Sequence, residues 1–291
     1  PLANAATKVP GARTVMEKTV GIAKERSLPK FHSTSFVDWF ESRGGAGVPE
    51  AQADRRALVF PDTYTNYNHP EVGKAAVKAL EAANVHVRIP EGVAGSGRPP
   101  HSKGFLDKAR ADAEQNVEAL APAVEEGWDV VLCEPSDAVM FQSDYLDLLS
   151  GDDVEAVAEH AYGVMEYVDA FRLDESLSFH PQDDYLTYHG HCHQKSTKKD
   201  HHAVGVLRRA GFEVDPLDST CCGMSGSFGY EAEHYSMSKA IGNILEGQVA
   251  ESPGDVVVAP GASCRTQLED MDGATDDPPH PVEMLARAID A

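Results

Sequence analysis

The sequence lacks several features that define common protein classes. Its 291 residues contain no apolar run that approaches the roughly 20 residues needed for a membrane-spanning helix, and no secretory signal pattern opens the chain. Lysine and arginine are scarce, with 25 residues against 47 aspartates and glutamates, so the formal net charge is −22. Such a charge opposes binding to nucleic acids and anionic membranes, and we expect neither as a partner.

Motifs of several enzyme classes are also missing. No Walker A run, Gly-x-Ser-x-Gly elbow or His-Glu-x-x-His motif occurs. A glycine-rich loop at 92–99 fails the dinucleotide fingerprint, because Pro100 stands where the third glycine belongs. Cysteine is rare, and an odd count of five without an export signal does not indicate a disulfide framework. Metal binding or catalysis is therefore the expected use of these thiols.

The acidic residues are unevenly distributed along the chain. Residues 1–50 carry 7 basic and 5 acidic side chains, so nearly all of the negative charge belongs to the remainder. A dense carboxylate surface with few lysines suits a protein that stays soluble in high salt, and we expect a halophilic protein; an ordinary acidic protein is the alternative. Because the first residue is Pro1, we expect a fragment of a longer polypeptide in which residues 1–50 contact other parts.

Two stretches of the chain repeat one order of elements. Each has an apolar strand, a helix, a second strand, a glycine-rich loop, a long helix and a third strand. Short apolar strands that alternate with helices predict an α/β fold with parallel sheets. We therefore predict two tandem similar βα units with mainly parallel sheets, preceded by a helical N-terminal arm. The expected bounds are 1–48 for the arm, 49–165 for the first unit, 166–183 for a linker and 184–291 for the second unit.

Four of the five cysteines lie in the second unit, in loops that directly follow strands. Cys192 follows the first strand, the adjacent pair Cys221 and Cys222 follows the second, and Cys264 follows the third. The carboxyl ends of parallel strands meet at one sheet edge, so we expect the four thiols to converge there. Adjacent cysteines rarely bridge each other, and Gly223 permits a positive φ or close approach of a bulky group, which makes it a cofactor-binding candidate. Four thiolates are what an iron–sulfur cluster requires, and we predict such an electron-transfer centre.

The first unit has no thiols at the corresponding positions. The loop spacing aligns Thr63, Gly95, Ser96 and Asp137 with the four cysteines, so we expect this unit to bind no cluster and to serve packing. The fifth cysteine, Cys133, ends an apolar strand outside this register. We expect it to be a small buried hydrophobe rather than a ligand.

Three histidines alternate around the first cysteine, at His189, His191 and His193. In an extended segment they would share one face. There they could hydrogen-bond sulfides, carry protons or replace a thiolate; ordinary loop histidines are the alternative. We select His191 and His193, which flank Cys192 most closely, as further cofactor-binding candidates.

Several runs of the sequence resemble a known family. They are 221–231 (CCGMSGSFGYE), 262–267 (ASCRTQ), 280–283 (HPVE), 60–67 (FPDTYTNY) and 134–136 (EPS). The second unit resembles the cysteine-rich "CCG" domain of heterodisulfide reductase and of the iron–sulfur subunits of glycolate oxidase, lactate-utilisation and anaerobic glycerol-3-phosphate dehydrogenase systems. The chain as a whole is similar to the C-terminal part of large fused FAD-linked oxidases of the D-lactate dehydrogenase type. The family motif ends Cys-x-x-Cys, whereas Gln267 stands at that last position here, which leaves the cluster type open.

This resemblance implies an electron-transfer function. The chain would be the iron–sulfur module of a flavin-linked oxidoreductase for a 2-hydroxy acid such as D-lactate or glycolate, with no catalytic residue of its own. A cluster held by Cys192, Cys221, Cys222 and Cys264, with [4Fe–4S] as the leading type, would pass electrons from FAD in a flavin-containing domain or subunit to a quinone or another carrier. The expected location is the cytoplasm, including the inner face of the membrane. A structural zinc site with the same thiolates and a thiol or heterodisulfide-handling redox domain remain alternatives.

Overall fold

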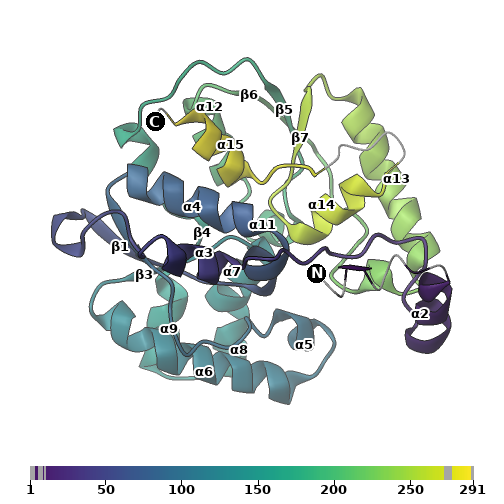
Figure 1. Cartoon of the computed structure of the whole chain (residues 1–291), viewed down its shortest axis with the longest axis horizontal. Helices are drawn as coiled ribbons and strands as arrows, with labels where there is room; N and C mark the ends of the chain where they lie inside the picture. The colour runs from purple at the N-terminus through teal and green to yellow at the C-terminus, as the bar shows by residue number, and fades with distance from the viewer. Residues whose placement is uncertain (1–3, 6–8, 10, 272–276, 290–291) are drawn as a thin grey trace.

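The computed structural model describes residues 4–5, 9, 11–271 and 277–289 (Figure 1). The strands are β1 (Arg55–Val59), β2 (Val85–Arg88), β3 (Asp129–Leu132), β4 (Ala161–Gly163), β5 (Tyr185–Tyr188), β6 (Glu213–Pro216) and β7 (Val256–Val258). The helices are α2 (Ala12–Val20), α3 (Phe36–Ser42), α4 (Pro70–Ala82), α5 (Arg98–Ser102), α6 (Leu106–Glu125), α7 (Pro135–Val139), α8 (Tyr145–Leu148), α9 (Asp152–Glu159), α10 (Val164–Ala170), α11 (Cys192–Ser196), α12 (His201–Arg209), α13 (Tyr235–Glu251), α14 (Ala262–Glu269) and α15 (Pro281–Ala288).

The strands form two parallel sheets. One has the order β2-β1-β3-β4 and the other the order β6-β5-β7, and every pairing in both is parallel. The first three strands of the two units therefore have the same order, because β1 lies between β2 and β3 as β5 lies between β6 and β7. The predicted α/β class, with two similar βα units and N-terminal helices, is confirmed. The residue bounds of the units remain a prediction, and α10 runs across the bound proposed after residue 165.

Helices from both units contribute to one apolar core. β3 is buried along its whole length, as expected for a parallel strand covered on both faces. Val72 and Leu80 of α4 share a buried cluster with Val282 and Leu285 of α15, and the two helices lie side by side in Figure 1. This shared core fixes the two sheets relative to each other.

The start of α15 explains one of the runs quoted above. His280 Nδ1 accepts a hydrogen bond from the Val282 amide at 3.0 Å, and the Glu283 carboxylate accepts one from the His280 amide at 2.8 Å. Together they form a capping box, with Pro281 in the first turn, where it needs no donor. The run HPVE therefore begins a helix that closes the core.

The N-terminal arm lies against the second unit. The Ala23 amide donates to the Tyr230 carbonyl at 2.7 Å, and the Ala232 amide donates to the Gly21 carbonyl at 2.7 Å. Figure 1 shows α2 beside α13. Within these residues the backbone of the arm pairs with the segment that follows the two adjacent cysteines, and contact of the arm with other parts of a longer polypeptide remains a prediction.

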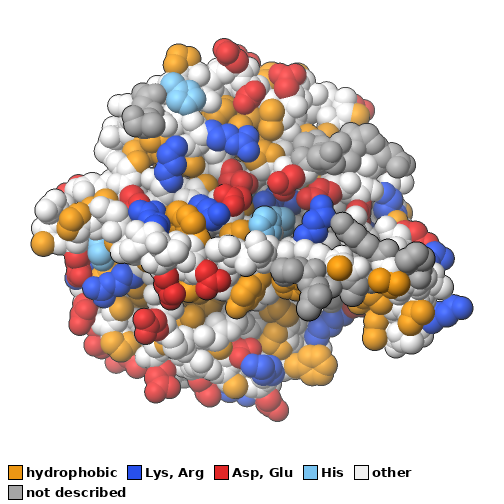
Figure 2. Space-filling view, viewed as in Figure 1, with side chains coloured by type: hydrophobic (Ala, Val, Ile, Leu, Met, Phe, Trp, Pro, Cys, Tyr) orange, Lys and Arg blue, Asp and Glu red, His pale blue; other side chains and the backbone are white. Residues whose placement is uncertain are grey.

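The surface agrees with the composition. On the face shown in Figure 2, acidic side chains are spread from top to bottom rather than gathered in one patch. Among the helices that the structure describes, none combines the length and the apolar character that crossing a membrane requires.

Candidate metal centre

Three loops bring four thiols together at the carboxyl edge of the second sheet. Cys192 begins α11 after β5, and Cys264 lies in the first turn of α14 after β7. Cys221 and Cys222 belong to the loop after β6. Side-chain contacts link the thiols in the order Cys192, Cys221, Cys222 and Cys264, and all are free cysteines. The expected convergence is therefore present in the structure.

The thiols differ in burial and in their ease of ionisation. Cys222 and Cys264 are buried, whereas Cys192 and Cys221 are half-buried. Hydrogen bonds from Cys192 and Cys222 lower the pKa of Cys221, and a hydrogen bond from Cys222 lowers the pKa of Cys264. The contacts with Cys221 raise the pKa of both Cys192 and Cys222. Four cysteine sulfurs at one sheet edge make a donor set suited to a soft metal or an iron–sulfur cluster, because the thiolate is the ligand form.

His189 forms a group with two of these sulfurs. One of its ring nitrogens lies within 4.8 Å of the sulfurs of Cys222 and Cys264. Its Nδ1 is 2.6 Å from Ser219 Oγ, and its Nε2 is buried with no hydrogen-bond partner of ordinary geometry among the described residues. The residue is wholly buried. A buried polar atom without an ordinary partner, on a residue close to two of the thiols, fits a site shaped to hold a bound group.

The two histidines selected from the sequence have other surroundings. His191 is the N-cap of α11, and its Nδ1 accepts from the His193 amide at 3.2 Å. Its ring lies over Gly261, where an added Cβ would come within 2.4 Å of His191 Cδ2. Burial lowers the pKa of His193 to about 4, so this ring is neutral at pH 7. The three rings do not share one extended face, because the chain enters a helix at Cys192.

Gly223 is required for the path of the cysteine loop. Its φ is +94°, and a Cβ there would lie 2.4 Å from the Ser238 carbonyl oxygen of α13. Its amide donates to Cys221 Sγ at 3.3 Å. The close approach that we expected at this glycine is thus to a helix, which presses the loop onto α13 and turns one amide toward a thiolate.

A buried arginine from the arm holds the same loop in place, and the sequence analysis missed it. The Arg26 guanidinium donates to the Gly229 carbonyl at 2.9 Å, Gln267 Oε1 at 2.7 Å, Ser238 Oγ at 2.9 Å and Asp270 Oδ2 at 3.0 Å. Its side chain is fully buried. One cation therefore joins the cysteine loop, α13 and α14. Nothing in the sequence around Arg26 indicates these distant partners.

The corresponding edge of the first sheet carries oxygen atoms instead of sulfur. Ser96 Oγ donates to Asp137 Oδ1 at 2.6 Å, which reproduces with oxygen the contact between Cys222 and Cys264. Burial raises the pKa of Asp137 well above its usual value. The other two aligned residues do not join this contact, since Thr63 is exposed and the carbonyl of Gly95 accepts a hydrogen bond from Asn116.

The two edges touch through an acidic side chain. Glu134 Oε2 accepts from the Ala262 amide at 2.9 Å, at the start of the helix that bears Cys264. Neighbouring Cys133 is buried in the shared apolar core, where its pKa is raised by desolvation, and its expected role as a small buried hydrophobe is confirmed. The first unit therefore supports the cysteine-bearing edge without contributing a thiol to it.

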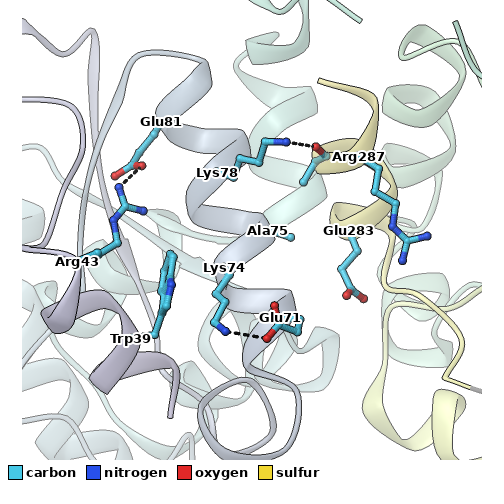
Figure 3. Close-up of a pocket in the computed structure, with 10 residues that line it drawn as sticks. Trp39, Arg43, Glu71, Lys74, Ala75, Lys78, Glu81, Glu283 and Arg287 are labelled. Carbon is cyan, nitrogen blue, oxygen red and sulfur yellow. Dashed lines mark hydrogen bonds and ion pairs between the residues drawn. The ribbon is translucent and has the colours of Figure 1, made fainter. Parts of the chain in front are cut away.

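A separate hollow of about 560 Å³ lies between α3, α4 and α15, away from the cysteines (Figure 3). Three of its cations have partners within the hollow. Arg43 pairs with Glu81 at 2.7 Å, Lys74 pairs with Glu71 at 2.7 Å, and Lys78 donates to the Ala286 carbonyl at 2.7 Å. These charges largely neutralise one another, so the thiol cluster is the stronger candidate for a functional site.

Comparisons with known proteins agree with this location. The family model of the cysteine-rich domain (CCG) matches residues 186–269, which contain all four clustered cysteines. The chain is similar to one of the subunits of the anaerobic glycerol-3-phosphate dehydrogenase of Escherichia coli (strain K12), with 30% identity over 293 residues that cover 99% of this chain and 72% of the relative. It is also similar to the D-2-hydroxyglutarate dehydrogenase of Escherichia coli, at 24% identity over 82% of this chain and 23% of the relative. The glycolate oxidase iron-sulfur subunit of the same organism is 25% identical over 76% of this chain and 55% of the relative.

Proposed function

We propose, from the premise that this chain belongs to the family of that anaerobic glycerol-3-phosphate dehydrogenase subunit, that it is the iron–sulfur electron-transfer part of a flavin-linked dehydrogenase. The observation that carries the proposal is the convergence of Cys192, Cys221, Cys222 and Cys264 at one sheet edge. Four thiols match the four ligands of a [4Fe–4S] cluster, which we propose as the bound group. Such a cluster supplies one-electron transfer when it is bound.

The chain's own residues position the ligands and shield them. Arg26 and Gly223 fix the loop that bears the adjacent cysteines, and α11 and α14 fix the other two. Cys222 and Cys264 are buried, so water reaches that side of the centre poorly, while the half-buried Cys192 and Cys221 form the more accessible side. We propose that electrons enter or leave through this accessible side, because electron transfer needs close approach of a partner.

The flavin would lie in a partner domain or subunit, and the acceptor would be a quinone or another carrier. We propose a 2-hydroxy acid as the oxidised substrate, since two of the three relatives above are named for D-2-hydroxyglutarate and glycolate. Glycerol 3-phosphate is the competing substrate, because a third relative is named for it. Reduction of the centre by the reconstituted flavin partner with each substrate in turn separates these two.

Two further parts of the proposal concern the setting of the protein. We propose a cytoplasmic location, with the assembled dehydrogenase at the inner face of the membrane where a quinone is reached. We also propose that the acidic surface is an adaptation to concentrated salt. Thermal unfolding in rising potassium chloride tests the second point, and a midpoint that does not rise between dilute and molar salt contradicts it.

The deciding experiment is metal analysis of anaerobically purified protein. We expect iron and acid-labile sulfide near four per chain, with a brown colour, for a [4Fe–4S] cluster. Cys222→Ser removes one buried ligand and should lose the iron while the protein stays folded by circular dichroism. Cys133→Ser changes a buried thiol outside the site and serves as the matched control, which should keep its iron.

The two alternatives, a structural zinc site and a thiol redox centre, give different results in the same metal analysis. Zinc without sulfide would make the site a structural zinc centre. Protein that stays free of metal after anaerobic reconstitution, with a titratable thiol pair at Cys221 and Cys222, would make it a thiol redox centre. Iron retained in Cys222→Ser would contradict the ligand assignment.

A further inference from the structure

His189 is held rigidly at the point where β5 ends. Its amide donates to the Val258 carbonyl of β7 at 2.9 Å, which continues the ladder of the sheet by one residue. The residue has no solvent exposure. The imidazole therefore leaves the sheet edge in a direction set by backbone pairing, and its position does not depend on a flexible loop.

A lysine and a serine contact the outer side of this imidazole. Lys195 of α11 donates from Nζ to the Leu217 carbonyl at 3.1 Å and to Ser219 Oγ at 3.3 Å, and it also contacts the Ser219 carbonyl. Ser219 Oγ lies 2.6 Å from His189 Nδ1. An ammonium group only donates, so the serine oxygen accepts from Lys195 and its own hydrogen is available to donate to Nδ1. Successive donors in one chain strengthen one another, which favours this direction.

The direction of that chain decides the tautomer of the ring. When Nδ1 accepts from Ser219, the proton of a neutral imidazole lies on Nε2. Within the described part of the protein, Nε2 is buried without an ordinary hydrogen-bond partner, and a ring nitrogen of His189 lies within 4.8 Å of the sulfurs of Cys222 and Cys264. Because Nδ1 is engaged by Ser219, Nε2 is the ring atom left to donate to one of these sulfurs.

We propose that His189 is a positioning residue of the metal centre, whose Nε2–H donates a hydrogen bond to the sulfur of Cys264 while Ser219 and Lys195 hold its tautomer. This proposal rests on the proposed function, because it concerns the centre that the four thiols bind. It leaves all four thiolates as ligands and adds a donor outside them. A hydrogen bond to a ligand sulfur withdraws negative charge, so it stabilises the reduced centre and raises its reduction potential.

The neighbouring histidines supply the control. His193 follows the proposed ligand Cys192 in the sequence. Its amide donates to His191 Nδ1 in the cap of α11, and its ring centroid lies 5.2 Å from that of His191. A purely structural effect of removing a histidine near the centre would appear at His193 as well. An effect through the donor proposed here would appear at His189 and Ser219, whereas His193, whose Nδ1 is also buried without an ordinary partner among the described residues, tests whether any such ring has the same effect.

The test compares the reduction potentials of four variants with that of the wild-type protein, by redox titration followed with electron paramagnetic resonance. We expect His189→Ala to retain its iron and to have a lower potential. His189→Gln carries an amide N–H of similar reach and should recover part of the shift. Ser219→Ala should give a smaller shift in the same direction, and His193→Ala should leave the potential unchanged. ¹⁵N-histidine labelling should show a weakly coupled nitrogen that disappears in His189→Ala.

Each contrary result has a distinct meaning. An unchanged potential in both His189→Ala and Ser219→Ala overturns the proposal. A strongly coupled, directly bound nitrogen in the wild-type protein, with iron lost from His189→Ala and His189→Gln, also overturns it and makes His189 a ligand. Wild-type protein that lacks iron and sulfide overturns the proposed function itself, and that result is read before any variant is compared.

Discussion

Arg26→Ala is expected to destabilise the protein more than any exposed charge substitution. The guanidinium is fully buried and makes four hydrogen bonds, one of them to the Asp270 carboxylate. Removal leaves that carboxylate, whose side chain is only 11% exposed, without its cation. Breaking a buried ion pair by removing one partner costs about 3–5 kcal/mol. Because whole domains are stable by only about 5–15 kcal/mol, the loss is a large fraction of the total.

The assay is urea unfolding of anaerobically prepared protein, followed by far-ultraviolet circular dichroism, with iron content measured in the same samples. Lys24→Ala is the matched control, since Lys24 belongs to the same arm but is 48% exposed and pairs only loosely, with Glu17 at 3.7 Å and Glu25 at 3.5 Å. Such a pair contributes less than about 1 kcal/mol. Arg26→Lys should fall between the two, because one ammonium cannot reach acceptors on three elements. A loss for Arg26→Ala within about 1 kcal/mol of the Lys24→Ala value would refute the reasoning.

Two further substitutions are Gly223→Ala, which tests the loop that bears Cys221 and Cys222, and Asp62→Asn, which tests the loop that follows β1 in the first unit. Gly223→Ala places a Cβ 2.4 Å from the Ser238 carbonyl at φ +94°, so we expect lost iron and a cost above about 2 kcal/mol, whereas Gly226→Ala, with φ +63° and nothing within 4 Å, should keep its iron. Equal iron in both variants would contradict this. Burial raises the pKa of Asp62 from 3.8 to about 6, because the folded protein favours the neutral carboxyl group. The stability that this neutral group contributes is therefore fully present below about pH 4 and is lost as the pH rises through about 6. The free energy of unfolding of Asp62→Asn, relative to that of the wild-type protein, should therefore rise by roughly 3 kcal/mol between about pH 4 and pH 7 when both are measured by urea unfolding. Free energies of unfolding that change in parallel with pH in the two proteins would exclude the effect.

The sheets and the convergence of the cysteines could be predicted because both depend on local patterns. Strands such as β3 and β7 are short apolar runs, and a loop that follows a parallel strand must emerge at the carboxyl edge. The loop spacing aligned Ser96 with Cys222 and Asp137 with Cys264. The hydrogen bond between Ser96 and Asp137 agrees with this alignment. These inferences needed only spacing and hydrophobic pattern.

What could not be predicted depends on contacts between distant residues or on a helix boundary. Arg26 binds atoms that lie 203 to 244 positions later in the chain, and no sequence periodicity reports such a pairing. The choice among the histidines depended on where α11 begins. Alternation suggested one shared face, but the helix starts at Cys192 and makes His191 its cap, which leaves His189 facing the thiols. The roles of His191 and His193 as cofactor-binding residues remain a prediction.

The long span of the arm's contacts also has a consequence for biosynthesis. Translation produces Arg26 early, and the last atom that it binds, Asp270 Oδ2, belongs to a residue made 244 positions later. Cys192, Cys221, Cys222 and Cys264 have all been synthesised by then. The entropy of closing so long a loop grows only with the logarithm of its length, so the buried contacts, once available, suffice to close it. During synthesis the arm can therefore pair with the loop near Gly229 first, but Arg26 completes its set of contacts only after all four cysteines have been made.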